Sequence, residues 1–257
     1  GAAVVDALVE RAAISVDEID DLIFGCVSQV GAQSSNIARS VCLSSVLGEG
    51  VPGTTVDRQC GSGQQAIHFA AQAVMSGTQD VVIAGGVESR SQVPIGANIV
   101  DGYKAEHGLP YGAKITERYP GVQFNQFVGA EMLAKKYKLG RQELNEFALA
   151  SHKNAIKAVD EGRFDNEIIP VEITLEDGTR VMHVQDEGIR MDASIESMTS
   201  LDPLQKGGVL SAANASQICD GAAAVMIVNG DTCKRLGLKP MAKIIALSVI
   251  GSDPVIM

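Results

Sequence analysis

The sequence lacks tryptophan, has few other aromatic residues and contains no pair of cysteines at a metal-binding spacing. Its five cysteines are odd in number and widely spaced, which argues against a disulfide framework and a zinc site and favours a reducing compartment. No apolar run approaches the roughly 20 residues that span a bilayer. The first residues, GAAVVDALVERAA, are amphipathic and contain acids, unlike a signal peptide. We therefore expect a cytoplasmic protein without a metal site.

Positive charge is also in short supply, since the formal net charge is −10. An acidic surface repels nucleic acids and anionic membranes, so neither is an expected partner. The 257 residues are 46% hydrophobic and 20% charged, which allows a sizeable core in one large domain or two smaller ones.

Strand-like and helix-like segments alternate at the start of the sequence. Apolar spacing predicts helices over residues 2–13, 34–47 and 61–75, the second with a serine cap, and strands over 21–27, 54–59 and 80–86. The apolar run DVVIAGG at 80–86 is typical of a strand buried on both faces. This alternation predicts a layered α/β domain.

The pattern is interrupted and then returns. Residues 90–125 are rich in glycine, proline and polar residues; helices are expected at 129–138 and 141–161, and a hairpin turns at Asp177-Gly178. After residue 218 we expect strands at 222–229 and 241–251 and a helix at 231–237. The chain is therefore divided into an α/β domain of residues 1–89 and 219–257 and an inserted domain of residues 90–218.

One short stretch, VDRQCGSGQQAIHFAAQAV, places Cys60 between a strand and a long helix. The helix is apolar nearly all round, so it should be buried and should point its free N–H groups at the thiol. Those groups favour the thiolate and can stabilise an oxyanion, while Gly61 and Gly63 leave room for a substrate. These features fit an acyl-transfer nucleophile, although a small buried core cysteine remains the alternative.

The segment VDRQCGSGQQAI, followed by DVVIAGGVES, closely resembles the active-cysteine region of thiolases, the acetyl-CoA acetyltransferases and 3-ketoacyl-CoA thiolases. The likeness continues in order through AEMLAKKYKLGRQELNEFALASHKNAIKAVDEGRFDNEIIPVEI, DEGIRMDASIESMTSLDPL and GGVLSAANASQICDGAAAVMIVN. It implies a thiolase-fold layered α/β/α half with an inserted α+β loop domain that binds CoA.

The resemblance also implies roles for single residues. Cys60 resembles the acylated nucleophile. Arg190, in DEGIR, and Ser197, in IESM, look like contacts to the adenine–ribose end of CoA, and Ala212 and Ser216, in SAANAS, look like contacts to pantetheine. The alternatives are a surface arginine and serines that cap local turns.

The implied activity is that of an acyltransferase. It cleaves 3-ketoacyl-CoA to acetyl-CoA and a shortened acyl-CoA through an acyl-cysteine. In the reverse direction it joins acetyl-CoA molecules by a Claisen condensation. CoA and acyl-CoA are then substrates, no cofactor is permanently bound, and a homodimer or homotetramer is expected. The alternatives are a ketoacyl-synthase-like condensing enzyme and a non-catalytic CoA-binding protein with a thiolase-like fold.

The sequence departs from the thiolase pattern in its catalytic partners. The family's second α/β half supplies a GHP-type histidine, a CxGGG-type cysteine and an NEAF-type asparagine, and none of these segments occurs here. The C-terminal α/β half is thus taken as absent, and the 257-residue chain alone is expected to be inactive. Asn125-Gln126 stands where short-chain biosynthetic members often carry His-Met, which favours a degradative or broader-specificity enzyme. The histidines that do not match the catalytic one are His68, His107, His152 and His183.

Overall fold

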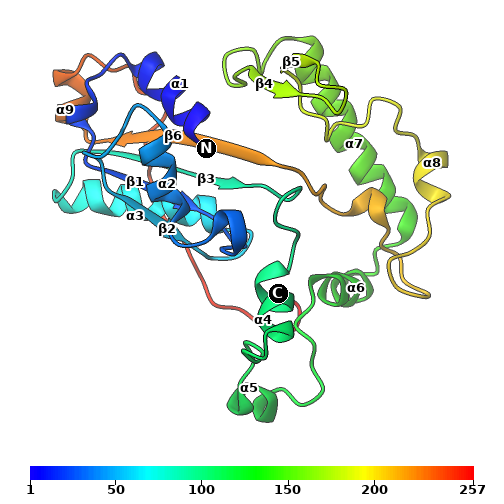
Figure 1. Cartoon of the computed structure of the whole chain (residues 1–257). Helices are drawn as coiled ribbons and strands as arrows, with labels where there is room; N and C mark the ends of the chain where they lie inside the picture. Colours follow the sequence, from blue (N-terminus) through cyan, green and yellow to red (C-terminus); the bar gives the residue numbers. More distant parts are fainter. The chain divides into compact units, whose positions relative to one another are not determined.

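The structure, a computed structural model, describes residues 1–257 (Figure 1). The chain forms two compact units. The first comprises Gly1–Pro110 and Cys219–Ser248, and the second comprises Tyr111–Ile218 and Val249–Met257. That the inserted residues form a CoA-binding domain stays a prediction.

A four-stranded sheet organises the first unit, in the order β2-β1-β3-β6. Its strands are β1 (Asp21–Gly25), β2 (Gly53–Val56), β3 (Val81–Glu88) and β6 (Gly221–Val228). The first three are parallel, and β6 runs antiparallel to β3. Parallel strands of one sheet end at the same edge, so the residues that follow β1, β2 and β3 gather there.

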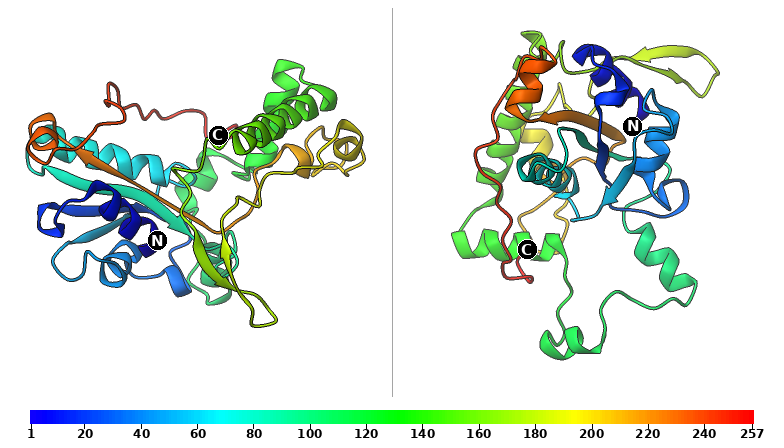
Figure 2. Two further views of the ribbon diagram at one scale, coloured as in Figure 1. Left: turned by 90° about the horizontal axis from the view of Figure 1, so that it is seen from above. Right: turned by 90° about the vertical axis from the view of Figure 1, so that its left-hand side faces the viewer.

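Helices cover both faces of this sheet, as the predicted α/β/α layering requires (Figures 1 and 2). Helices α1 (Ala2–Ala12) and α2 (Ile37–Ser44) pack on one face, where Val5, Val41 and Phe24 are in one buried cluster. Helix α3 (Ser62–Ser76) packs on the other face through Ala66, Ala70 and Val74. Because β1 and β3 are covered on both sides, their buried residues, 22–24 of β1 and 81–84 of β3, are apolar without alternation.

Two helices differ in detail from the sequence-based predictions. Helix α2 begins at Ile37 and not at Ser34, because the Asn36 side chain accepts the N–H of Arg39 and also donates to the carbonyl of Gly53 on β2. Helix α3 is not buried all round. Phe69 and Met75 are 41% and 63% exposed, since the sheet covers only one side of the helix.

The strand predicted at residues 241–251 does not form. Isolated strands are not stable in water without a hydrogen-bonding neighbour, and this segment pairs with none. Its apolar side chains are correspondingly open, with Met241 98% and Ile245 89% exposed. The short helix before it is present as α9 (Gly230–Arg235).

Helices dominate the second unit. Its main elements are α6 (Gln126–Tyr137) and α7 (Arg141–Asp160), which are followed by the hairpin of β4 (Val171–Thr174) and β5 (Arg180–His183). The hairpin turn contains Gly178 with a φ of 84°, a conformation that favours glycine, as predicted for Asp177-Gly178. Residues 90–125, rich in glycine, proline and polar residues, hold two short helices: α4 (Ala97–Lys104) in the first unit and α5 (Ala113–Arg118) in the second. Another short helix, α8 (Ile195–Thr199), lies after the hairpin in the second unit.

No helix in the structure has both the length and the apolar character to cross a membrane.

Candidate active site

Cys60 lies in the tight turn that connects β2 to α3, and its side chain is exposed. The turn begins at Asp57, directly after β2, and is closed by hydrogen bonds from Gly61 N–H to the Arg58 carbonyl and from Ser62 N–H to the Gln59 carbonyl, both 3.0 Å. The thiol therefore stands at the edge of the sheet where the parallel strands end. Cys60 is thus exposed, whereas Cys26, Cys42 and Cys233 are buried.

The beginning of α3 has no side-chain cap. Gly61 is the N-cap residue and makes no side-chain capping bond. The first N–H groups of an α-helix have no partner inside the helix, and their partial positive charge favours an anion nearby. A negative charge that develops close to Cys60 would thus meet backbone donors.

Gly25, the last residue of β1, lets α3 begin directly against the sheet. A Cβ at this position would overlap the backbone carbonyl carbon of Ser62 and lie 2.5 Å from the nitrogen of Gly63. Only a residue without a side chain permits this approach. The position of the Cys60 turn therefore depends on a glycine in another strand.

A partly buried carboxylate, Glu88, joins the ends of β1 and β3. Its oxygens accept the N–H groups of Val27 and Ser28 at 2.9 and 3.0 Å and the amide of Gln33 at 3.0 Å. Arg90 lies 3.3 Å from the same carboxylate. Partial burial acts to raise the pKa of Glu88, but the two backbone donors, the amide and the arginine charge outweigh it and hold the pKa below its ordinary value.

Cys26 follows β1 at the same edge and is 1% exposed. Its N–H donates to the carbonyl of Val56, the last residue of β2. Cys26 therefore lies beside the point where the Cys60 turn begins. Burial, with the nearby charge of Glu88, raises the pKa of the Cys26 thiol to about 11. Cys26 is therefore an inert thiol at neutral pH.

The predicted adenine–ribose contacts both lie in the second unit. Arg190 is exposed, and its backbone N–H donates to Nδ1 of His152 on α7 at 3.2 Å. Ser197 lies in α8, and its hydroxyl accepts the Ser194 N–H at 3.1 Å and donates to the Ser194 carbonyl at 3.0 Å. The hydroxyl of Ser197 thus takes part in a helix cap, which was the alternative reading of this serine.

The predicted pantetheine contacts lie on a loop that is held from two sides. Ala212 and Ser216 are exposed. Just before them, the carboxylate of Glu131 on α6 accepts the N–H groups of Val209 and Leu210 at 2.9 to 3.1 Å. Between them, Asn214 donates to the buried Asn145 on α7 at 3.0 Å. None of these contacts was predicted, because neither Glu131 nor Asn145 carries a signal in the sequence that distinguishes it from a helix-surface residue.

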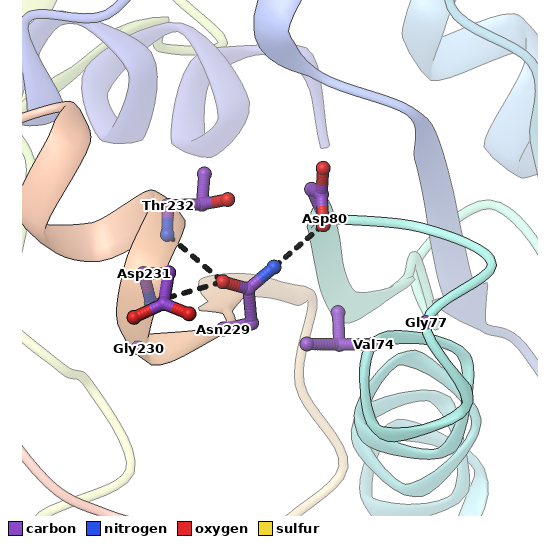
Figure 3. A pocket seen from close by; sticks show the side chains of 7 residues that line it. All are labelled: Val74, Gly77, Asp80, Asn229, Gly230, Asp231 and Thr232. Carbon is purple, nitrogen blue, oxygen red and sulfur yellow. Dashed lines mark hydrogen bonds between the residues drawn. The ribbon is translucent and has the colours of Figure 1, made fainter.

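A hollow of about 450 Å³ lies at the other edge of the sheet (Figure 3). It is lined by Val74, Gly77, Asp80 and residues 229–232. Asp80 directly precedes β3, so the hollow lies at the amino end of the strands, away from Cys60. Its polar groups are already paired: the Asn229 amide donates to Asp80 at 2.5 Å, and its oxygen accepts the first N–H groups of α9. Asn229 thus links the start of β3 to the start of α9, and the hollow is not the candidate active site.

The layered α/β/α unit, with a cysteine at a glycine-rich strand-to-helix turn, has the fold of the thiolase class. Residues 1–231 match the family of the thiolase N-terminal domain. The chain belongs to the thiolase family.

Individual relatives cover the whole chain. It is 45% identical over 252 residues to the steroid 3-ketoacyl-CoA thiolase FadA6 of Mycobacterium tuberculosis, covering 97% of this chain and 60% of that protein. It is 38% identical to a 3-ketoacyl-CoA thiolase of Acinetobacter baylyi, covering 100% of this chain and 64% of the relative. A crystal structure of the acetyl-CoA acetyltransferase of Bacillus anthracis superposes with a TM-score of 0.85 and 34% identity over 99% of this chain and 65% of that one. The chain thus spans about 60 to 66% of the length of the relatives it matches.

Proposed function

We propose that the protein is an acyltransferase that cleaves 3-ketoacyl-CoA with CoA, or condenses acyl-CoA molecules in the reverse direction, through an acylated Cys60. The observation that carries this proposal is the exposed Cys60 thiol at the uncapped start of α3. Its support is the ordered similarity to proteins named as thiolases over the whole chain.

In the first step, the Cys60 thiolate attacks the carbonyl carbon at position 3 of the substrate. The carbonyl oxygen becomes an oxyanion, for which the N–H groups at the start of α3 are suitable donors. When the oxyanion collapses, the bond between carbons 2 and 3 breaks. The electron pair leaves on the acetyl-CoA enolate, which takes a proton and departs as acetyl-CoA.

In the second step, the sulfur of free CoA loses its proton and attacks the acyl-cysteine thioester. The shortened acyl group passes to CoA, and Cys60 is released as thiolate. Both proton transfers need an acid/base group. We assign that role to none of the residues of this chain.

Holding CoA falls to the second unit in this proposal. Arg190 presents a flat cation that can stack on adenine or pair with a phosphate. Ala212 and Ser216 lie on the loop that Glu131 and Asn145 hold in place, where Ser216 offers a hydroxyl to the amides of pantetheine. The hydroxyl of Ser197 is fully used within its helix cap, so a contact of Ser197 to CoA would require it to exchange one of its bonds with Ser194.

The decisive experiment replaces the nucleophile in the full-length protein that contains this sequence. Cys60→Ala should lower thiolysis of 3-ketoacyl-CoA by several orders of magnitude while CoA binding persists. Cys219→Ala is the matched control, because Cys219 is the other exposed cysteine. Turnover retained in Cys60→Ala would end the proposal. Acyl transfer to acyl-carrier protein in place of CoA would assign the protein to the condensing enzymes.

We further propose a cytoplasmic location and a homodimer or homotetramer. In favour of a reducing compartment, all five cysteines are unpaired thiols. Light scattering of the full-length protein measures the oligomeric state.

A further inference from the structure

The residue before Cys60 has an unusual backbone conformation. Gln59 has a φ of 48°, in the left-handed region. For a residue with a side chain, this region costs roughly 1–2 kcal/mol. Such a conformation persists only when the surrounding structure holds it.

Both peptide groups of Gln59 are held in place. Its N–H donates to Oδ1 of Asp57 at 2.7 Å. Its carbonyl accepts the hydroxyl of Ser62 at 2.5 Å and the Ser62 N–H at 3.0 Å. The oxygen of that hydroxyl also accepts the N–H of Arg58 at 2.9 Å, so one side chain bridges the two residues that precede Cys60.

Ser62 is well suited to fix this turn. Its side chain is 4% exposed, so water does not compete for its hydrogen bonds. Its backbone lies against Gly25 of β1, which anchors it to the sheet. Cys60, only two residues earlier, is exposed.

The hydroxyl of Ser62 does not serve as a cap for its own helix. A capping serine accepts an N–H from the helical residues that follow it, whereas Ser62 reaches back to Arg58 and Gln59. The N-cap position belongs to Gly61. The contacts of Ser62 are therefore directed at the turn that carries Cys60.

We propose that Ser62 is a positioning residue for Cys60: its hydroxyl holds Gln59 in the left-handed conformation that directs the thiol to the open start of α3. This inference rests on the proposed role of Cys60 as the nucleophile. Displacing a reacting group by about 1 Å can cost about 100-fold in rate. Loss of the hydroxyl should therefore reduce acylation of Cys60 far more than it reduces substrate binding.

The test is Ser62→Ala in the full-length protein, with acyl-Cys60 formation followed by rapid quenching and mass spectrometry. We expect the acylation rate to fall by about 10- to 100-fold, with the Kd for CoA within about twofold of the wild-type value. Ser76→Ala is the matched control: it removes a serine hydroxyl that donates to the Ala73 carbonyl at the far end of the same helix. An acylation rate in Ser62→Ala equal to that of the control would overturn the proposal.

A rescue separates positioning from general helix stability. Glycine adopts the left-handed region without a Cβ penalty, so Gln59→Gly added to Ser62→Ala should restore most of the acylation rate that Ser62→Ala loses. No recovery would overturn the assigned mechanism. Failure of the nucleophile proposal looks different, because it appears as turnover in Cys60→Ala whatever Ser62 does.

A second pair of variants leaves Ser62 in place, should its replacement prevent folding. Gln59 is exposed, so its side chain can be changed without disturbing the core. Gln59→Val, with a β-branched residue that resists the left-handed region, should lose much more acylation rate than Gln59→Asn, which tolerates it. Equal rates in these two variants would contradict the proposal.

Discussion

The backbone N–H of Arg190 donates a hydrogen bond to Nδ1 of His152, with the two atoms 3.2 Å apart. His152 lies on α7, whereas Arg190 lies in the irregular segment after β5. Nδ1 is the acceptor in this bond, so it offers its lone pair to the Arg190 N–H. A helix residue therefore holds the loop that carries the arginine proposed to contact CoA.

We predict that His152→Ala raises the KM for CoA by roughly 2- to 10-fold and leaves kcat unchanged, as expected from the loss of one hydrogen bond of about 0.5–1.5 kcal/mol. Steady-state thiolysis at varied CoA concentration measures both constants. His152→Asn keeps an acceptor near the position of Nδ1 and should retain most of the affinity. Lys153→Ala, an exposed neighbour on α7, is the control. A KM that stays at the wild-type value in His152→Ala would show that the bond does not hold Arg190 in its binding position.

Gly25→Ala should displace the start of α3. The new methyl group would overlap the backbone of Ser62 and Gly63, which cannot move away as a flexible side chain could. We expect the free energy of unfolding to fall by about 1–3 kcal/mol, with a loss of Cys60 acylation beyond what the fraction unfolded explains. Urea unfolding and the acylation assay measure the two effects. Gly50→Ala, where a Cβ meets nothing within 4 Å, is the matched control, and equal behaviour of the two variants would refute this account of Gly25.

Glu88→Gln tests the carboxylate that joins β1 and β3. The new amide would place a donor among N–H groups that need acceptors, so we expect a loss of about 1–3 kcal/mol in the free energy of unfolding at pH 7. Because the folded-state pKa of Glu88 is below its ordinary value of 4.5, the carboxylate stabilises the fold above that pH, and this stabilisation is lost as the pH falls through the folded-state pKa. The difference between wild type and variant should therefore shrink as the pH falls below 4.5. Urea midpoints from pH 7 to pH 3 measure it, with exposed Glu10→Gln as control; a constant difference would contradict the assignment.

The sequence predicted the parts of the fold in which residue pattern and environment coincide. The uninterrupted apolar run of β3 indicated a strand covered on both faces, and the glycine-flanked Cys60 indicated a strand-to-helix turn; the structure confirms both. The sequence-based predictions were wrong for apolar residues that no other part of this chain covers. Residues 241–251 have the apolar pattern of a strand without forming one, and Phe69 and Met75 on α3 are exposed.

Contacts between residues distant in sequence could not be predicted from the pattern. Glu131 holds Val209, and Glu88 holds Val27, across 78 and 61 positions of sequence, with no local signal at either end. The left-handed Gln59 is likewise unmarked, because the residues that hold it there, Asp57 and Ser62, are common in turns of every kind. The apolar pattern of a sequence predicts which residues are buried. These polar contacts instead depend on which segments the complete fold brings together, and that information is not local.

The cysteines should differ sharply in reactivity toward iodoacetamide. Cys60 and Cys219 are exposed, whereas Cys26, Cys42 and Cys233 are buried. With its pKa raised to about 11, Cys26 is ionised in roughly one molecule in a thousand at pH 8, and only the thiolate reacts. We expect Cys60 to be alkylated at least about 100-fold faster than Cys26 at that pH, as peptide mass spectrometry of timed samples would measure.

Substrate protection distinguishes the two exposed thiols. If an acyl-CoA acylates Cys60, prior incubation with it blocks alkylation of Cys60 and leaves the rate at Cys219 unchanged. Cys219 is thus the internal control for reagent and pH. Because Cys26 is held neutral by burial, its rate should rise as the pH approaches 11, whether or not the acyl-CoA is present. Equal protection of Cys60 and Cys219, or alkylation of Cys26 as fast as Cys60 at pH 8, would contradict the placement of the reactive sulfur at the start of α3.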